Sequence, residues 1–135
     1  MKDGIKAVII CDHKVLLLLR DDKPECNYPL HWQIIGGGIE EGESPEEALL
    51  REVREETTYE IKEFLFLEKV KGSKGEDVYR YLVKVKEDEK DKFKIGEEGL
   101  EVRFFSIEEI ENLKLTPGTR KYFEERKKDF IEWMK

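Results

Sequence analysis

Gly36–Tyr59 has the sequence GGGIEEGESPEEALLREVREETTY and is the most informative stretch of the chain. Its three consecutive glycines predict either backbone at unusual φ and ψ angles or a close contact with a neighbouring group. Ser44, Pro45 and Glu47 predict the start of a helix, because serine caps free amides, proline suits the first turn and the glutamate completes a capping box. We expect this helix to end near Thr57.

The predicted helix carries three glutamates on one side. At 100° per residue, Glu52, Glu55 and Glu56 fall within one arc of about 100°, and Leu49 and Val53 on the next arc can face a core. Like charges at this spacing repel each other unless cations lie between them. Carboxylate oxygens are the ligands that hard divalent ions such as Mg²⁺ prefer. A charged face exposed to water is the alternative, and the adjoining glycines and capping box favour a metal site.

The spacing of charged residues around this helix resembles the signature of the Nudix hydrolases, G-x5-E-x7-R-E-U-x-E-E-x-G-U, in which U is bulky and aliphatic. The matching residues are Gly37, Glu43, Arg51, Glu52, Glu55 and Glu56. Upstream, Trp32–Gly37 resembles the family's W-x-x-P-G-G segment, and Leu16–Arg20 resembles the strand before it. The resemblance implies an α+β protein with the Nudix fold, a mixed β-sheet sandwiched between helices (α/β/α), in a single domain over residues 1–135.

Three positions depart from the signature. Thr58 replaces its glycine, Tyr59 replaces the aliphatic residue that follows, and Ile35 replaces the proline before the glycines. The family glycine would end the helix in a left-handed conformation, which suits a β-branched residue poorly. We therefore expect the helix to end in another conformation at Thr58. None of the departures removes a carboxylate.

The resemblance implies a metal-dependent hydrolase that cleaves the pyrophosphate bond of a nucleoside diphosphate derivative, with Mg²⁺ or Mn²⁺ as its cofactor. The expected metal ligands are Glu52, Glu55, Glu56, a backbone carbonyl of Gly36 or Gly37, Glu43 through water, and a later carboxylate such as Glu98. Glu52, Glu55, Glu56 and Arg51 would be the catalytic residues, with Arg51 orienting a carboxylate. Glu52 is the first candidate for the general base. Glu97, Glu98 and Glu101 are the later candidates, and plain surface charge is the alternative for each of them.

Substrate contacts are expected around the glycines. Gly37 and Gly38 lack side chains and would let a phosphate approach. Arg20 is either a phosphate ligand or an exposed arginine at a strand end. The aromatic candidates for stacking on a base are Tyr28, Trp32 and Phe104, and core packing is the favoured alternative for Phe104.

The resemblance to the family also implies a preferred substrate class. The ADP-ribose subgroup tends to have a proline downstream of the signature, where this chain has Lys74 and Gly75. The absence of such subgroup marks favours hydrolysis of a (deoxy)nucleoside triphosphate to a monophosphate and pyrophosphate. ADP-ribose and dinucleoside polyphosphates are the alternative substrates. A non-catalytic nucleotide-sensing module and a plain cation-binding domain are the alternatives outside the enzymes.

The composition suits one folded domain of 135 residues, with 39% hydrophobic and 42% charged residues. The formal net charge of −7 disfavours a nucleic-acid duplex or an anionic membrane as a partner, and no apolar run is long enough to span a bilayer. Cys11 and Cys26 form no metal motif and fit free thiols in a reducing compartment. We expect a cytoplasmic monomer or homodimer whose partner is a small nucleotide.

Hydrophobic periodicity predicts the remaining elements. Strands are expected over residues 5–10, 15–19, 32–35, 60–71, 77–86 and 101–105, with loops over 21–31 and 86–99. A short helix over 107–113 follows a second capping box, and a last helix begins after Thr116. In the last helix, Phe123, Phe130, Ile131 and Met134 are expected to share one face.

Overall fold

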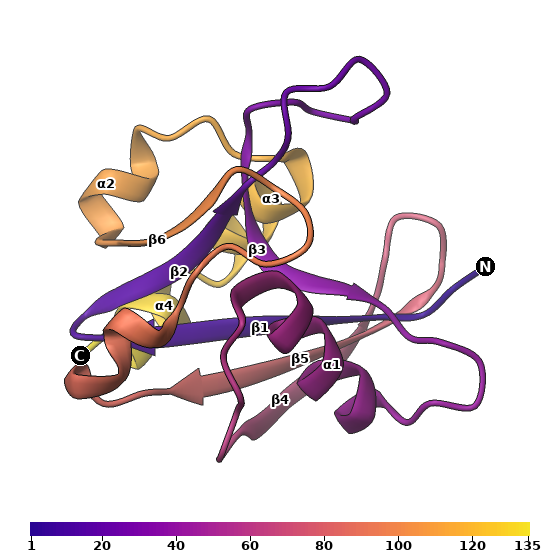
Figure 1. Cartoon of the computed structure of the whole chain (residues 1–135), viewed down its shortest axis with the longest axis horizontal. Helices are drawn as coiled ribbons and strands as arrows, with labels where there is room; N and C mark the ends of the chain where they lie inside the picture. The colour runs from indigo at the N-terminus through magenta and orange to yellow at the C-terminus, as the bar shows by residue number, and fades with distance from the viewer.

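The computed structural model describes the whole chain, residues 1–135. Six strands form one mixed sheet: β1 Gly4–Cys11, β2 Lys14–Leu19, β3 Trp32–Gly38, β4 Leu65–Lys71, β5 Asp77–Lys84 and β6 Glu101–Phe105. The helices are α1 Pro45–Thr57, the 3₁₀ helix η1 Glu87–Lys92, α2 Ile107–Glu111, α3 Pro117–Glu125 and α4 Lys127–Trp133. The strand order is β4-β5-β1-β3-β2-β6, with only β1 and β5 parallel. Figure 1 shows α1 across one face and α3 and α4 behind the other, which confirms the predicted layers.

Each face of the sheet has its own hydrophobic core. Successive side chains of a strand point to opposite faces, so β1 contributes Ile5 and Ile9 to the core under α1, and Val8 and Ile10 to the core under α3 and α4. This double burial explains why β1 and β2 are nearly continuous apolar runs rather than alternating ones. None of the helices combines the length and the hydrophobicity that a bilayer span requires.

The three glycines belong to β3, which continues to Gly38 instead of ending at residue 35 as predicted. They have no positive φ angle, so the close contact is the correct one of the two predicted reasons. A Cβ on Gly36 would overlap the carbonyl oxygen of Ile5, and a Cβ on Gly37 would overlap the carboxylate of Glu52. The absent side chain of Gly37 therefore leaves room for Glu52 of α1, and that of Gly36 leaves room for β1.

The C-terminal end of α1 is fixed by the segment that follows η1. Three carbonyl groups of the last turn accept backbone N–H groups of Lys94, Gly96 and Glu97, at 2.9–3.0 Å. Such carbonyls have no partner within a helix. Gly96 lies so close that a Cβ there would overlap the carbonyl oxygen of Glu55. The predicted loop over 86–99 thus contains the helix η1 and brings Glu98 beside α1.

The expectation for Thr58 was wrong. Thr58 follows α1 with φ 63° and ψ 0°, which is the left-handed conformation that a glycine would adopt. Its backbone N–H donates to the carbonyl of Arg54, and its hydroxyl donates to the carbonyl of Lys92 at 3.3 Å. Tyr59 is then buried and stacks on Phe93, with ring centroids 4.2 Å apart. These contacts hold the β-branched residue in an unfavourable conformation.

Two further element boundaries differ from the predictions. β4 begins at Leu65 rather than at residue 60, because its partner β5 ends at Lys84 and leaves residues 60–62 without a strand to pair with. The last helix is broken at Arg126, whose φ is −118°. The break turns α4 relative to α3, so Ile131 is 43% exposed and does not share the buried face of Phe130.

Replacing Thr58 with glycine is expected to raise the free energy of unfolding by up to about 1 kcal/mol, because glycine adopts the left-handed conformation without steric strain. Thr58→Ala is the matched control: it removes the same hydroxyl but keeps a Cβ, and we expect no gain from it. Urea unfolding followed by circular dichroism compares the three proteins. A clear loss of stability in Thr58→Gly would show that the conformation costs nothing.

Candidate active site

Three glutamates of α1 face the glycine end of β3. The carboxylate of Glu56 accepts the backbone N–H of Gly36 at 3.2 Å, and the carboxylate of Glu52 occupies the space above Gly37. Glu55 lies one turn from Arg51 and accepts a hydrogen bond from its guanidinium at 3.0 Å. The helical spacing thus places Glu52 and Glu56 beside Gly36 and Gly37, and it places Glu55 beside Arg51.

Arg51 joins three segments of the site. Its guanidinium donates two hydrogen bonds to Glu43, at 2.8 and 2.9 Å, and one to the carbonyl of Gly38 at 2.8 Å. It also donates to Glu52 and Glu55, both at 3.0 Å. Forked arginine–carboxylate pairs are among the stronger and more directional polar contacts in proteins. Arg51 therefore connects the loop before α1, the end of β3 and α1 itself.

The carboxyl groups differ sharply in their electrostatic surroundings. Burial raises the pKa of Glu56 to about 8, and the nearby carboxylates of Glu52 and Glu98 act in the same direction. Burial also raises the pKa of Glu52, although hydrogen bonds from Arg51 oppose it. The hydrogen bonds from Arg51 instead hold the pKa of Glu43 at about 2. The site contains more buried negative charge than its own cations compensate.

Their oxygen atoms are suitable ligands for a hard divalent cation, but the side chains do not converge on one coordination site. No three side chains of His, Cys, Asp or Glu converge on one point, since Glu52 and Glu55 are bonded to Arg51 and Glu56 to Gly36. The three side chains offer only oxygen atoms, which Mg²⁺ and Mn²⁺ prefer. A bound cation would supply the positive charge that Glu56 lacks.

Lys6 is a residue of this site that the sequence analysis missed. It lies opposite Gly36 on β1, and its side chain passes over the face of Gly36. Burial lowers the pKa of its ammonium group, although the carboxylates of Glu56 and Glu52 act in the opposite direction. No hydrogen bond or ion pair of the fold uses its ammonium group. A lysine in the middle of the buried run GIKAVII was the available signal.

Arg20 and Glu98 lie on a small hollow next to Glu56. Its volume is about 90 Å³, and Gln33, Cys26 and Asp21 also line it. The guanidinium of Arg20 donates to the carbonyl of Asn27 at 2.6 Å and to the side chain of Gln33 at 2.8 Å. Arg20 therefore anchors the loop over residues 21–31 while it faces the carboxylate site.

The structure separates the other predicted residues from this site. Trp32 is buried in the core under α3 and packs edge-to-face on Phe105, so it cannot stack on a ligand in this conformation. Phe104 packs edge-to-face on Phe93, which is the favoured alternative for it. Tyr28 is 51% exposed on the loop and contacts His31.

The later carboxylates also differ from one another. Glu101 pairs with Arg103, a residue whose guanidinium lies over the Trp32 ring on the α3 side of the sheet. Side chains two residues apart on a strand share a face, so Glu101 is on the wrong side of the sheet to meet α1. Glu97 contacts α1 through its backbone N–H. Glu98 is the one that lines the hollow beside Glu56.

A larger groove of about 380 Å³ lies on the opposite face, between the sheet and α3. Residues that line it include Lys6, Gln33, Arg80, Thr116, Tyr122 and Arg126. Lys6 and Gln33 connect it to the carboxylates, since Lys6 lies over Gly36 and Gln33 also lines the small hollow. The groove and the small hollow that Glu56 lines thus share Gln33.

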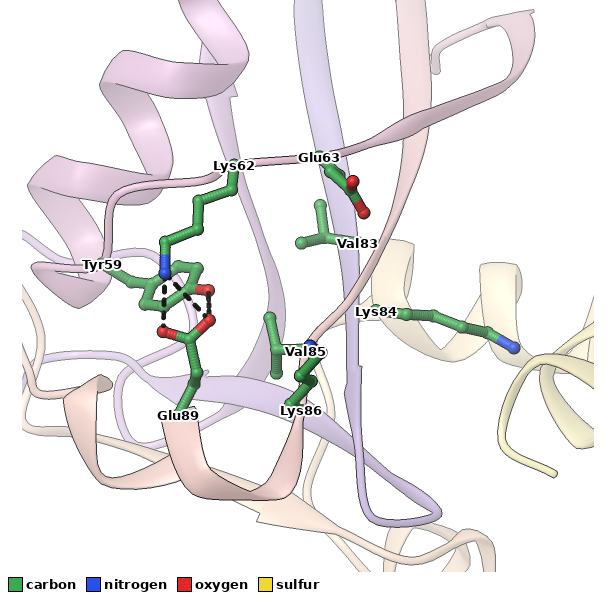
Figure 2. Close-up of a pocket in the computed structure, with 8 residues that line it drawn as sticks. All are labelled: Tyr59, Lys62, Glu63, Val83, Lys84, Val85, Lys86 and Glu89. Atoms are coloured by element: carbon green, nitrogen blue, oxygen red, sulfur yellow. Dashed lines mark hydrogen bonds and ion pairs between the residues drawn. The ribbon is translucent and has the colours of Figure 1, made fainter.

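Figure 2 shows a different hollow, of about 230 Å³, at the far end of α1. The carboxylate of Glu89 there accepts hydrogen bonds from the hydroxyl of Tyr59 at 3.0 Å and from the ammonium of Lys62 at 3.1 Å. Lys84 points away from this pair. Glu89, Tyr59 and Lys62 bond to each other and join η1 to the segment after α1, so we assign the chemistry to the carboxylate site.

Comparisons with known proteins agree with this geometry. The model of the NUDIX domain family matches residues 2–133. Dihydroneopterin triphosphate diphosphatase of Escherichia coli is 42% identical over 48 residues, which are 36% of this chain and 29% of that protein. The chain thus matches less than a third of the length of this curated relative.

Solved structures show the same fold. A MutT/nudix family protein from Enterococcus faecalis has a TM-score of 0.65 and 26% identity, over 77% of this chain and 43% of that chain. The NUDIX domain of Shewanella oneidensis NrtR, in complex with ADP ribose, has a TM-score of 0.73 and 19% identity, over 96% of this chain and 88% of that chain. With the family model matched from residue 2 to residue 133, this chain belongs to the NUDIX domain family.

Proposed function

We propose that this chain is a metal-dependent hydrolase that cleaves the pyrophosphate bond of a nucleoside diphosphate derivative. The observation that carries the proposal is the buried, undercompensated carboxylate pair of Glu52 and Glu56 against the glycines of β3. A folded protein keeps such charge at a cost, and a site for a cation with a phosphate ligand explains why it is retained. The family membership supports the same activity.

The proposed cofactor is Mg²⁺ or Mn²⁺, held by Glu52, Glu55 and Glu56, with a backbone carbonyl of Gly36 or Gly37 and with Glu98 as further candidate ligands. When bound, the ion supplies charge neutralisation for the phosphates and lowers the pKa of water. Glu43 and Arg51 position α1 against the loop rather than touch the substrate. Glu52, whose pKa is raised by burial, is the proposed acceptor of the proton from the attacking water.

The proposed substrate position follows from the groups around Gly36, which are the carboxylate of Glu56 and the side chain of Lys6. The diphosphate would lie between the carboxylates and the free ammonium of Lys6, with the glycine backbone letting it approach. Arg20 lines the small hollow and would bind the phosphates from there, with a phosphate oxygen replacing the side-chain oxygen of Gln33 as its acceptor. The nucleoside would extend into the groove beside α3, whose volume of about 380 Å³ is in the range of small-molecule sites.

The first substrate candidate is a (deoxy)nucleoside triphosphate, hydrolysed to a monophosphate and pyrophosphate. The local match to a dihydroneopterin triphosphate diphosphatase supports a triphosphate ester with a bicyclic ring as a close variant of this class. ADP-ribose is the second candidate, because a structural neighbour is described in complex with it. A nucleotide panel with Mg²⁺ distinguishes these candidates by their products.

Activity is expected to require a divalent ion and to increase toward alkaline pH, because Glu52 and Glu56 must be deprotonated. Glu56→Gln keeps the shape of the side chain and removes its charge, so turnover should fall at least about a hundredfold and metal affinity should fall with it. Release of pyrophosphate or orthophosphate during a Mg²⁺ titration measures both. Glu43→Gln is the milder comparison.

Wild-type turnover of Glu56→Gln at ordinary Mg²⁺, or full turnover in excess chelator, would contradict the proposal. A folded protein that hydrolyses no nucleotide in the panel would instead favour a nucleotide-sensing module.

Lys6→Met is expected to lower kcat/KM by at least about tenfold, since it removes a charge-assisted contact to the substrate phosphates. The melting temperature should stay the same or rise, because the fold provides no partner for the buried ammonium. Lys84→Met is the matched control, a lysine at the end of β5 that lines neither the groove nor the small hollow. Equal kinetic effects of the two substitutions would exclude a phosphate contact for Lys6.

In metal-free buffer, the folded protein is expected to lose stability as the pH rises from about 5 to 9. The folded-state pKa of Glu56 is about 8, above its ordinary value of 4.5, so the contribution of its neutral form to stability is complete below pH 4.5 and is lost as the pH rises through 8. Glu56→Gln should remove this dependence and exceed the wild type by up to about 5 kcal/mol at pH 9. Urea unfolding at several pH values tests this.

Saturating Mg²⁺ should restore the stability of the wild type at pH 9 and have little effect on Glu56→Gln. Parallel pH profiles of the two metal-free proteins would mean that Glu56 ionises normally.

A further inference from the structure

The groove beside α3 contains two buried polar atoms that no group of the protein satisfies. They are the Nε of Arg80 and the hydroxyl oxygen of Tyr122. Tyr122 is only 4% exposed, and both residues line the groove. An unpaired buried donor is costly, and in native structures such groups are rare. Both atoms are enclosed by neighbouring groups, so a ligand in the groove would become their partner once those side chains move aside.

Arg80 is held in one orientation by its neighbours. Its guanidinium lies 3.8 Å from the centroid of the Tyr122 ring and donates to Glu68 at 3.0 Å. Glu68 in turn accepts two hydrogen bonds from Arg126, at 3.0 and 2.7 Å. Glu68 is thus shared by two arginines, and its contacts leave Nε of Arg80 as a single donor held in place. An N–H group of arginine only donates, so it needs an acceptor atom as its partner.

The position of Arg80 matches the expected path of the substrate. Gly36, Lys6 and Arg80 lie opposite one another on the neighbouring strands β3, β1 and β5. Two inter-strand spacings place the backbone of Arg80 about 10 Å from that of Gly36. The side chains of Lys6 and Arg80 point to the same face, into the same groove. A nucleotide with its diphosphate at Lys6 would bring its ring to Arg80.

We infer that Arg80 and Tyr122 form a specificity pair that selects heterocycles with a ring carbonyl oxygen over those with an amino group at the same position. This inference rests on the proposed function. The Nε–H of arginine only donates, so it pairs with a carbonyl oxygen and opposes an amino group. The Tyr122 hydroxyl can donate to the second lone pair of the same oxygen, since burial keeps it protonated by raising its pKa.

Two matched substrate pairs test this selection. ITP and ATP differ in the 6-oxo or 6-amino group of the purine, and UTP and CTP differ in the 4-oxo or 4-amino group of the pyrimidine. With wild-type protein and Mg²⁺, kcat/KM should favour the oxo member of at least one pair by about tenfold or more. Arg80→Met should reduce this ratio to within about twofold, and Tyr122→Phe should reduce it in part.

The controls separate recognition from folding. Tyr122→Phe removes only a hydroxyl that has no partner, so its melting temperature should not fall. Arg103→Met removes an arginine that also lies over aromatic rings, but on the edge strand β6, and it should keep the wild-type ratio. Circular dichroism of each variant checks that it is folded.

The outcomes distinguish the inference from the function on which it rests. Hydrolysis of all four nucleotides without an oxo preference, or a preference that persists in folded Arg80→Met and Tyr122→Phe, would overturn the specificity pair and leave the hydrolase intact. Hydrolysis of none of the four at any Mg²⁺ concentration would overturn the pair together with the proposed triphosphate substrate.

Discussion

The five hydrogen bonds of the Arg51 guanidinium are the interaction on which the site depends. They join Glu43 in the loop before α1, the carbonyl of Gly38 at the end of β3, and two glutamates of α1 itself. Planar guanidinium groups hold carboxylates in fixed directions. With Arg51 in place, α1 cannot rotate or slide along β3 without breaking several charge-assisted contacts, so Glu52 and Glu56 stay above the glycines. What Arg51 does not do is compensate Glu56, whose only hydrogen-bond donor in the protein is the backbone N–H of Gly36.

Gly36 connects the two faces of the sheet. On one side α1 presents Glu56 to its backbone, and on the other side the stem of Lys6 occupies the space that a side chain would fill. The carboxylate of Glu56 and the stem of Lys6 therefore lie on two sides of Gly36, and Lys6 also lines the groove beside α3. In a molecule with a polyphosphate and a ring, one part is highly charged and the other is largely neutral, and this arrangement offers a separate surface for each part. The carboxylates suit the cation and the phosphates, while the groove supplies hydrogen-bond donors for the rest.

Sequence reasoning predicted the parts of the molecule that depend on local rules. Helical periodicity placed Glu52, Glu55 and Glu56 on one side of α1, and the capping box at Ser44 fixed where that helix begins. It failed where distant contacts decide. Thr58 is left-handed because residues 94–97 hold the end of α1, and Trp32 is buried because α3 packs over β3. Lys6 was overlooked because β1 is buried on both faces, which hides the alternation that marks an inward-facing charge. Arg80 and Tyr122 are 42 residues apart, and only the fold reveals that they meet.

The central claim is that the undercompensated carboxylates of α1 are completed by a divalent cation. A crystal grown with Mn²⁺ and measured at a wavelength where manganese scatters anomalously tests this directly. We predict an anomalous peak within coordination distance of Glu56 and at least one of Glu52 and Glu55, about 2.0–2.4 Å from their oxygens. The glutamates that bind the ion should have turned away from Arg51 or from the N–H of Gly36. A structure with full Mn²⁺ exposure, no peak between α1 and β3 and the present hydrogen bonds unchanged would contradict the account.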